Sequence, residues 1–197
     1  MTRTNKFWVA ALVFLVFTCG GLATLACLGV AWADPDIGGA CVRDSLSRTP
    51  GAACMTLAAS LLNWHDPGAV ARWFWVDCAF VVVYLSMFVL FALASTRTLF
   101  ADTGHPARTA IATTLIAIAL AGGFADWVEN SRALTALQDP SINGIAGSEI
   151  DSIAKATTLK WRFLALASLS TLVMSLLAAY RIAARMYRSR ISKGLSP

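Results

Sequence analysis

Residues 109–130 read TAIATTLIAIALAGGFADWVEN, an apolar segment that ends in three polar side chains. The part before Asp126 carries no charge and, as a helix, covers most of the roughly 30 Å hydrocarbon core of a membrane. In a helix, Asp126, Glu129 and Asn130 lie on one face, because residues three and four apart are neighbours. Gly122, one turn earlier, allows another helix to pack closely. This stretch therefore predicts a membrane-spanning helix with a polar face at its end.

The composition of the whole chain indicates an integral membrane protein. Of its 197 residues, 57% are hydrophobic and 14% are charged. The mean hydropathy is +0.65, which excludes an ordinary soluble domain. Apolar runs long enough to cross a membrane cover four segments, about 7–33, 70–95, 108–130 and 157–182. We therefore expect an all-α fold, in which residues 1–197 form a single membrane domain: an antiparallel four-helix transmembrane bundle with a short exported amphipathic helix.

The basic residues gather on one side of the predicted membrane. They precede the first segment, flank the connection between the second and third, and follow the fourth: Arg3, Lys6, Arg97, Arg108, Arg181, Arg185, Arg188, Arg190 and Lys193. The positive-inside rule then places both termini in the cytoplasm of a bacterial inner membrane, with residues 183–197 as a basic cytoplasmic tail. Because the net charge of +5 follows this topology instead of forming one patch, it does not indicate nucleic-acid binding.

The first segment has a second interpretation as a cleaved secretory signal. Ala31-Trp32-Ala33 fits the small-residue cleavage rule, and Arg3 and Lys6 provide a charged start. However, the apolar run is longer than the core of a signal peptide, which is roughly 7–15 residues. We therefore favour an uncleaved membrane anchor.

Residues 34–69 are predicted to form the exported part of the chain. The stretch 34–51 is rich in Gly, Pro and Asp and predicts an irregular loop. Apolar residues at helical spacing follow it and predict a short helix over Ala52–Trp64. Cys41 and Cys54 both lie in this part, in a compartment where disulfides persist. We therefore expect either a bridge between these cysteines or two free thiols.

Polar residues from three of the segments are predicted to meet near the exported face. Asp77 lies among apolar and aromatic residues about one turn inside the membrane, and Tyr84 follows deeper on the same helix face. A carboxylate at that depth is costly unless it pairs or is protonated, so it indicates a site. The predicted ligand-binding or ion-pair cluster has six members: Asp77, Tyr84, Asp126, Glu129, Asn130 and Lys160.

Three carboxylates and one amine allow two arrangements. Either Lys160 forms an ion pair with a shared proton, or a bound cationic or polar ligand completes the charge balance. Arg132 and Arg162 are nearby alternatives to the lysine as the pairing base. A plainer interpretation is that these residues are solvated at the membrane interface and that a structural hydrogen bond holds Asp77.

The sequence lacks the motifs of several chemistries. It has no Cys-x-x-Cys pair, no Gly-rich phosphate loop and no Gly-x-Ser-x-Gly motif. Its two histidines, His65 and His105, fall in predicted loops, which disfavours a haem or a histidine-based metal site. We therefore expect no cofactor and no metal, assign no catalytic residue and favour a role other than catalysis.

These residues resemble the motifs of a group of small bacterial four-span inner-membrane proteins. That group shares an aromatic-flanked Asp followed by Tyr in the second span, Asp-x-x-Glu-Asn at the end of the third, and Lys-Trp at the start of the fourth. Here the motifs are Asp77 with Tyr84, residues 126–130, and Lys160 with the tryptophan after it. The resemblance covers roughly residues 52–180 and implies a shared site without indicating a substrate.

Three functions fit this pattern. The first is binding of a lipid or amphipathic small molecule in an apolar cavity headed by the cluster. The second is a proton- or cation-coupled carrier, in which Asp77, Asp126 and Glu129 titrate. The third is a structural or assembly subunit, whose small-residue helix faces bind another membrane protein or a second copy of the chain. Membrane lipids are partners in all three.

Overall fold

The computed structural model describes residues 3–29, 35–46, 52–62, 67–101, 105–138 and 147–194. Within these ranges the chain forms six helices and no strand, which confirms the predicted all-α class. The helices are α1 (Arg3–Gly29), α2 (Pro35–Leu46), α3 (Ala52–Leu62), α4 (Pro67–Leu99), α5 (His105–Gln138) and α6 (Gly147–Gly194).

Three of these helices are long and apolar enough to cross a membrane. The segments are Gly68–Leu99 of α4, Pro106–Leu137 of α5 and Ser148–Ser189 of α6. Large apolar side chains are exposed on these helices and on α1, among them Val16, Val82, Phe124 and Leu176. Because such surfaces are stable in lipid and costly in water, the helices support an integral membrane protein.

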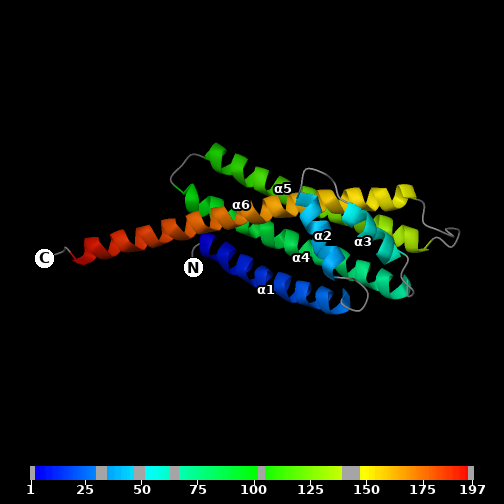
Figure 1. Ribbon diagram of the computed structural model, residues 1–197. Helices are drawn as coiled ribbons and strands as arrows, with labels where there is room; N and C mark the ends of the chain where they lie inside the picture. Colours follow the sequence, from blue (N-terminus) through cyan, green and yellow to red (C-terminus); the bar gives the residue numbers. More distant parts are fainter. Residues whose placement is uncertain are drawn as a thin grey trace.

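The central helices α4, α5 and α6 pack against one another, and α1 packs along α4. Figure 1 shows these four helices side by side, with the chain reversing direction from each to the next. The short helices α2 and α3 pack on each other and on α6, and together we call them the cap. The cap lies toward one end of the molecule, whereas the start of α1 and the end of α6 lie toward the other, uncapped end (Figure 1).

Aromatic contacts hold α1 against α4 at the uncapped end. Trp8 Nε1 donates a hydrogen bond to Thr98 Oγ1 at 3.1 Å. The Trp8 ring also meets Phe91 edge to face, with centroids 5.9 Å apart. The Arg97 guanidinium lies 4.0 Å from the centre of the Phe7 ring. Since these side chains combine an apolar body with a polar partner, they fix this end of α1 to α4.

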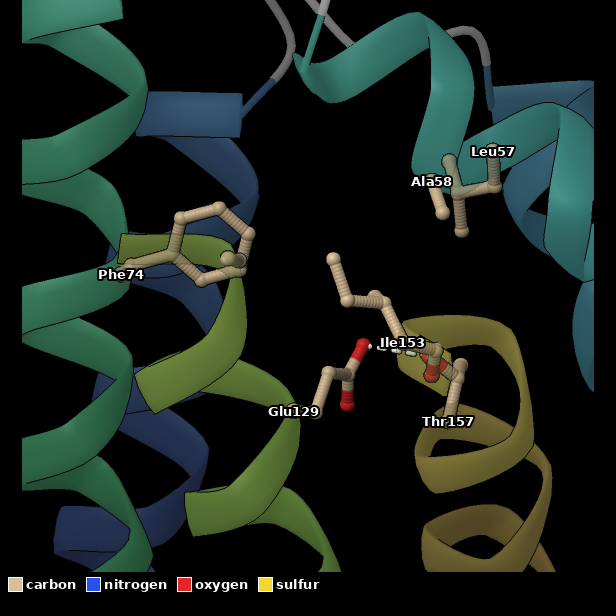
Figure 2. Close-up of a pocket in the computed structure, with 7 residues that line it drawn as sticks. Leu57, Ala58, Phe74, Glu129, Ile153 and Thr157 are labelled. Carbon is tan, nitrogen blue, oxygen red and sulfur yellow. Dashed lines mark hydrogen bonds between the residues drawn. The ribbon is translucent and has the colours of Figure 1, made fainter. Parts of the chain in front are cut away.

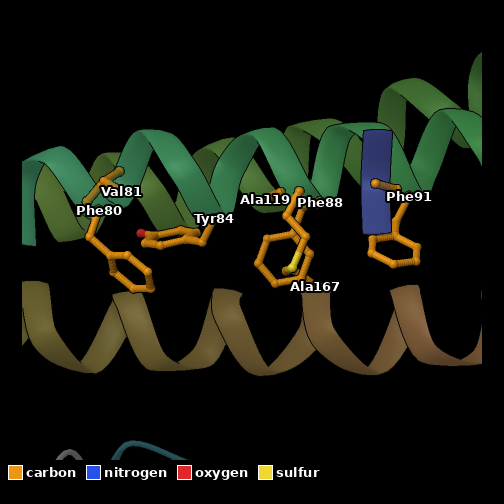
Figure 3. Packing of buried hydrophobic residues seen from close by; sticks show 9 residues of the cluster. Phe80, Val81, Tyr84, Phe88, Phe91, Ala119 and Ala167 are labelled. Atoms are coloured by element: carbon orange, nitrogen blue, oxygen red, sulfur yellow. The ribbon is translucent and has the colours of Figure 1, made fainter. Parts of the chain in front are cut away.

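An apolar core fills the space between the long helices (Figure 3). Phe80, Tyr84 and Phe88 follow one another along α4 and contact edge to face, with centroids 5.5 and 6.3 Å apart. Opposite these rings, α5 and α6 present small residues, Ala119 and Ala167. Lipid is as apolar as these side chains, so the shape match between rings and alanines stabilises this part of the molecule.

Gly122 and Gly123 let α5 approach both of its neighbours. A Cβ at Gly122 would lie 3.2 Å from the Cβ of Phe163 on α6. A Cβ at Gly123 would lie 2.5 Å from Cδ1 of Leu85 on α4. Both distances are shorter than ordinary contact between carbon atoms, so a larger residue would require α6 to shift at Gly122 and the Leu85 side chain to move at Gly123. The close approach predicted at Gly122 is confirmed, and it occurs one turn before Asp126.

The prediction of an irregular loop over 34–51 is wrong for residues 35–46, which form α2. Pro35 suits the first position of a helix, where no backbone N–H is needed. Packing on α3 and α6 offsets the weak helix propensity of Gly38-Gly39. The helix predicted over Ala52–Trp64 is present as α3, and its last two residues lie outside the described ranges.

A disulfide makes the cap one covalently linked unit. Cys41 of α2 and Cys54 of α3 are bonded, with Cα atoms 4.5 Å apart. Ser45 Oγ donates a hydrogen bond to the Cys41 carbonyl at 2.8 Å. Arg162 Nε of α6 donates to the Ser45 carbonyl at 2.7 Å. This hydrogen bond attaches α2 to α6, and α3 also packs on α6.

The long helices extend beyond the predicted membrane segments. The connection expected between the second and third segments, residues 96–107, is shorter, because α4 reaches Leu99 and α5 begins at His105. α5 extends past the predicted third segment, which ended near residue 130, and ends at Gln138, two positions before Pro140 in the sequence. Most of the predicted tail, 183–197, belongs to α6, which continues as a helix to Gly194.

Candidate functional site

Three helices place six polar side chains in one buried group, which we call the acid/lysine cluster. α4 contributes two of them, α5 three and α6 one. They are Asp77 (5% exposed), Tyr84 (5%), Asp126 (1%), Glu129 (9%), Asn130 (0%) and Lys160 (9%). The three from α5 share one face because they lie three and four residues apart. The structure thus brings together all six residues that the sequence singled out.

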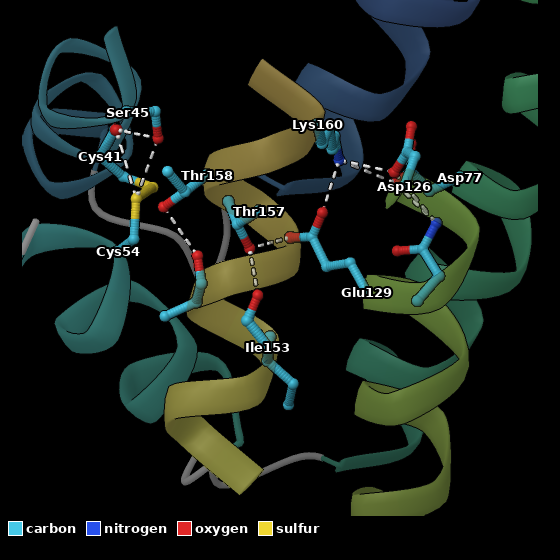
Figure 4. Close-up of polar contacts among 12 residues, drawn as sticks. Cys41, Ser45, Cys54, Asp77, Asp126, Glu129, Ile153, Thr157, Thr158 and Lys160 are labelled. Atoms are coloured by element: carbon cyan, nitrogen blue, oxygen red, sulfur yellow. Dashed lines mark hydrogen bonds and ion pairs between the residues drawn. A yellow bond between two sulfur atoms is a disulfide. The ribbon is translucent and has the colours of Figure 1, made fainter. Parts of the chain in front are cut away.

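Lys160 lies at the centre of the cluster (Figure 4). Its Nζ is 2.7 Å from Asp126 Oδ1 and 3.0 Å from Glu129 Oε2. It is 3.8 Å from Asp77 Oδ2. The contact with Asp126 has the length of a charge-assisted hydrogen bond, whereas the contacts with Glu129 and Asp77 are ion pairs, and Glu129 Oε2 has no hydrogen-bond donor among the described residues. One ammonium therefore connects acids of α4 and α5 to α6.

Neutral side chains also donate hydrogen bonds to the two aspartates. The Tyr84 hydroxyl donates to Asp126 Oδ2 at 2.6 Å. Asn130 Nδ2 donates to Asp77 Oδ2 at 3.0 Å and, less closely, to Asp126 Oδ1 at 3.4 Å. Asn130 Oδ1 is buried and has no hydrogen-bond donor among the described residues. Because each aspartate receives a directional hydrogen bond, both carboxylates are held in fixed orientations.

Thr157 belongs to the site and was not predicted from the sequence. Its Oγ1 donates to Glu129 Oε1 at 2.7 Å and lies 3.0 Å from the Ile153 carbonyl of its own helix. The sequence feature that could have identified Thr157 is its position three residues before Lys160, which puts both side chains on one face of α6. A threonine in an apolar helix usually bonds to its own backbone, so the sequence alone does not distinguish it.

The two arginines considered as alternative partners contact other groups. Arg132 donates from Nη1 to Ser152 Oγ, which connects α5 to α6. Arg162 donates to the Ser45 carbonyl, which connects α6 to the cap. The cluster itself contains three carboxylates and one ammonium, so its formal charge is negative when all four groups are ionised.

The geometry around Lys160 also bears on metal binding. Within the described ranges, no group of three His, Cys, Asp or Glu side chains is arranged to hold a metal ion. The ammonium of Lys160 lies between the carboxylates and forms ion pairs with their oxygens. A divalent ion needs several of these oxygens as ligands, and the lysine already binds them.

A small pocket connects the cap to the cluster (Figure 2). Its volume is about 10 Å³, close to the space that one water molecule requires. Leu57 and Ala58 of α3 form one end, and the Glu129 carboxylate lies opposite them. Side chains of α4, α5 and α6 complete the wall: Phe74, Ala133, Ile153 and Thr157. Glu129 therefore belongs to both the cluster and the pocket.

Comparisons of the chain with protein-family models, with curated proteins and with solved structures found no match. The resemblance to small four-span inner-membrane proteins therefore stays a prediction.

Proposed function

We propose that the protein is a multi-pass inner-membrane carrier that exchanges protons for small monovalent cations at the acid/lysine cluster. In this proposal α1, α4, α5 and α6 cross the membrane as an antiparallel four-helix bundle, with both termini in the cytoplasm and the cap exported. The distribution of Lys and Arg along the sequence supports this orientation. One observation carries the function, namely the burial of three carboxylates around a single ammonium.

Charge balance limits what the cluster can bind. Asp77, Asp126 and Glu129 are costly to ionise together when one ammonium faces them in a site shielded from water. Each proton taken up by a carboxyl, or each monovalent cation bound, reduces the negative charge of the cluster by one. Asn130 Oδ1, buried without a donor among the described residues, offers an acceptor to a protonated neighbour. The cluster is therefore suited to gain and lose positive charge.

The ammonium of Lys160 carries one positive charge and lies 2.7 Å from an oxygen of Asp126 and 3.0 Å from an oxygen of Glu129. One ammonium offsets only one of the three carboxylates, so a proton on a carboxyl or a bound cation supplies further positive charge. When a protonated carboxyl of the cluster releases its proton to water, a sodium or potassium ion takes the place of that proton beside the carboxylate. One proton leaves for each cation bound, so the charge of the site is conserved.

The dimensions of the pocket favour an ion over a lipid. The pocket that reaches Glu129 has a volume of about 10 Å³. Sites for larger ligands are typically about 300–1,000 Å³. An acyl chain would therefore require a large rearrangement of α3 and its neighbours, whereas a single ion or water would not. Lipids remain partners of the outer helix faces, where large apolar side chains are exposed.

Packed rings separate the cluster from the uncapped end. Beyond Tyr84, Phe88 and Phe91 of α4 lie in the buried apolar core with Ala119 and Ala167 (Figure 3). This arrangement favours a carrier over an open channel. Transport then requires a second conformation, in which the cluster is reached from the cytoplasmic side.

The proposal is tested with the full chain in liposomes that contain a trapped pH-sensitive dye. A sodium gradient directed into the vesicles is expected to drive protons outward and raise the internal pH, and a potassium gradient measures selectivity. Glu129→Gln is expected to abolish this exchange, whereas Glu149→Gln, the same change outside the cluster, is expected to preserve it. Circular dichroism verifies that both variants are folded.

Two results would contradict the carrier. One is a wild-type protein that moves no protons in response to either sodium or potassium. The other is a folded Glu129→Gln variant that exchanges as fast as the wild type.

A further inference from the structure

The cap helix α3 closes the pocket that ends at Glu129 (Figure 2). Ala58 is buried and lies with Leu57 at the pocket end away from the glutamate. Phe74 of α4 and Ala133 of α5 line the wall between them. Because both alanines are small, the pocket keeps room for about one water molecule. A larger side chain at either position would fill it.

Glu129 is the carboxylate of the cluster that lines this pocket. Asp77 and Asp126 do not line it, and their oxygens accept hydrogen bonds from Asn130 and Tyr84. The hydroxyl of Thr157, which binds Glu129, also faces the pocket. A molecule that passes the cap therefore meets the carboxylate of Glu129 and the hydroxyl of Thr157 before it meets the lysine.

The attachment of α3 is uneven around the pocket. The disulfide between Cys41 and Cys54 bonds α3 to α2, and Arg162 binds α2 to α6 through the Ser45 carbonyl. α3 packs mainly on α2 and α6 and has only minor contacts with α4 and α5. Local opening costs least where a segment has few packing contacts. The edge of α3 that faces α4 and α5 is therefore the edge that opens most readily.

We propose that the gap beneath Leu57 and Ala58 is the external entrance of the cluster, through which water and a monovalent cation reach Glu129. The size of the side chain at position 58 sets the size of what passes. The passage of the cation rests on the carrier function proposed above, whereas the entry of water does not. The two parts are therefore tested separately.

Entry of water is tested by hydroxyl-radical footprinting of the full chain in lipid nanodiscs, read by mass spectrometry. Radicals formed from a water inside the pocket oxidise the side chains next to it, although these are shielded from bulk solvent. We expect Phe74 and Ile153, which are 2% and 4% exposed, to be oxidised in the wild type. Phe88, buried in the apolar core away from the pocket, is the internal reference.

Substitutions that fill the pocket provide the matched comparison. Ala58→Leu is expected to lower oxidation of Phe74 and Ile153 several-fold. Ala59→Leu makes the same change at the next position of α3, outside the pocket lining. This variant is expected to leave the oxidation of Phe74 and Ile153 unchanged. Ala133→Leu fills the pocket from α5, and it provides the same test if Ala58→Leu does not fold.

The passage of the cation is tested with the same variants in the liposome assay. Ala58→Leu and Ala133→Leu are expected to slow sodium-driven proton movement several-fold, and Ala59→Leu is expected to retain the wild-type rate. Wild-type oxidation of Phe74 and Ile153 no greater than that of Phe88 would overturn the entrance. So would folded pocket-filling variants that change neither oxidation nor transport.

The two proposals fail in different ways. Oxidation that responds to Ala58→Leu, in a protein that moves no protons, would retain the entrance for water and reject the carrier. Sodium-driven proton movement at the wild-type rate in both pocket-filling variants would retain the carrier and reject the entrance.

Discussion

The two ends of the core formed by α4, α5 and α6 are stabilised in different ways. Toward the cap, charged and polar side chains from all three helices bind one another through the ammonium of Lys160. Toward the uncapped end, the rings of Phe88 and Phe91 lie in an apolar core with Ala119 and Ala167. Packing tolerates small shifts of the helices, whereas a buried charge network requires one arrangement. The comparison indicates that the capped end fixes the register of the helices and the uncapped end supplies contact area.

The largest effect is expected when the ammonium is removed. Lys160→Met leaves three buried carboxylates without their counterion and is expected to lower the free energy of unfolding by about 3–5 kcal/mol. The matched control is Lys155→Met, one turn earlier on α6. Lys155 binds Asp151 at 2.6 Å with a side chain that is 70% exposed, so its loss costs about 0.5 kcal/mol or less. Unfolding in mixed detergent micelles measures both variants.

Equal losses for the two lysine variants would mean that the charge network does not stabilise the capped end. In that case apolar packing would stabilise both ends of the core, and the two ends would not differ. If Lys160→Met instead unfolds only at high pH, where the carboxyl groups stay ionised, then protons bound by these groups at lower pH replace the positive charge of the ammonium.

A smaller loss is expected when a ring is removed from the uncapped end. Phe88→Ala leaves a cavity beside Tyr84 and is expected to cost about 3 kcal/mol, near the lower end for a buried Phe. Phe124→Ala removes a ring that is 67% exposed to the surroundings and is expected to be nearly neutral. The same unfolding measurement compares them. A similar cost for both would show that the apolar core is not closely packed.

The smallest effect is expected at the edge of the cluster. Thr157→Val removes the hydroxyl that donates to Glu129 and is expected to cost about 1.5 kcal/mol. Thr158→Val is the control, because Thr158 is equally buried and donates to the Ala154 carbonyl of its own helix. If the two variants unfold with the same free energy, the hydrogen bond to Glu129 contributes nothing beyond local helix bonding.

Much of the cluster could be predicted because its determinants are local. Asp126, Glu129 and Asn130 lie three and four residues apart, so a helix places them on one face without further information. Asp77 and Lys160 stood out because charge within an apolar segment is costly. The sequence could not give the distances between helices, and therefore did not show that Lys160 binds Asp126 and Glu129 more closely than it binds Asp77.

The cap was harder to predict because its structure depends on distant contacts. Gly38-Gly39 and the residues around it have the composition of a loop, and α2 forms because it packs on α3 and α6. Neither Thr157 nor Ala58 carries a chemical signal of its own. Their roles follow from their positions next to Glu129, and those positions exist only once four helices are assembled.

The length of α6 joins the capped and the uncapped end of the molecule. It is a single helix of 48 residues without an internal proline, which corresponds to about 72 Å. Lys160 lies in the first third of this helix, and the arginine-rich last third continues it. Because the helix is unbroken, a rotation of its first third about the helix axis would also turn the arginines at its other end.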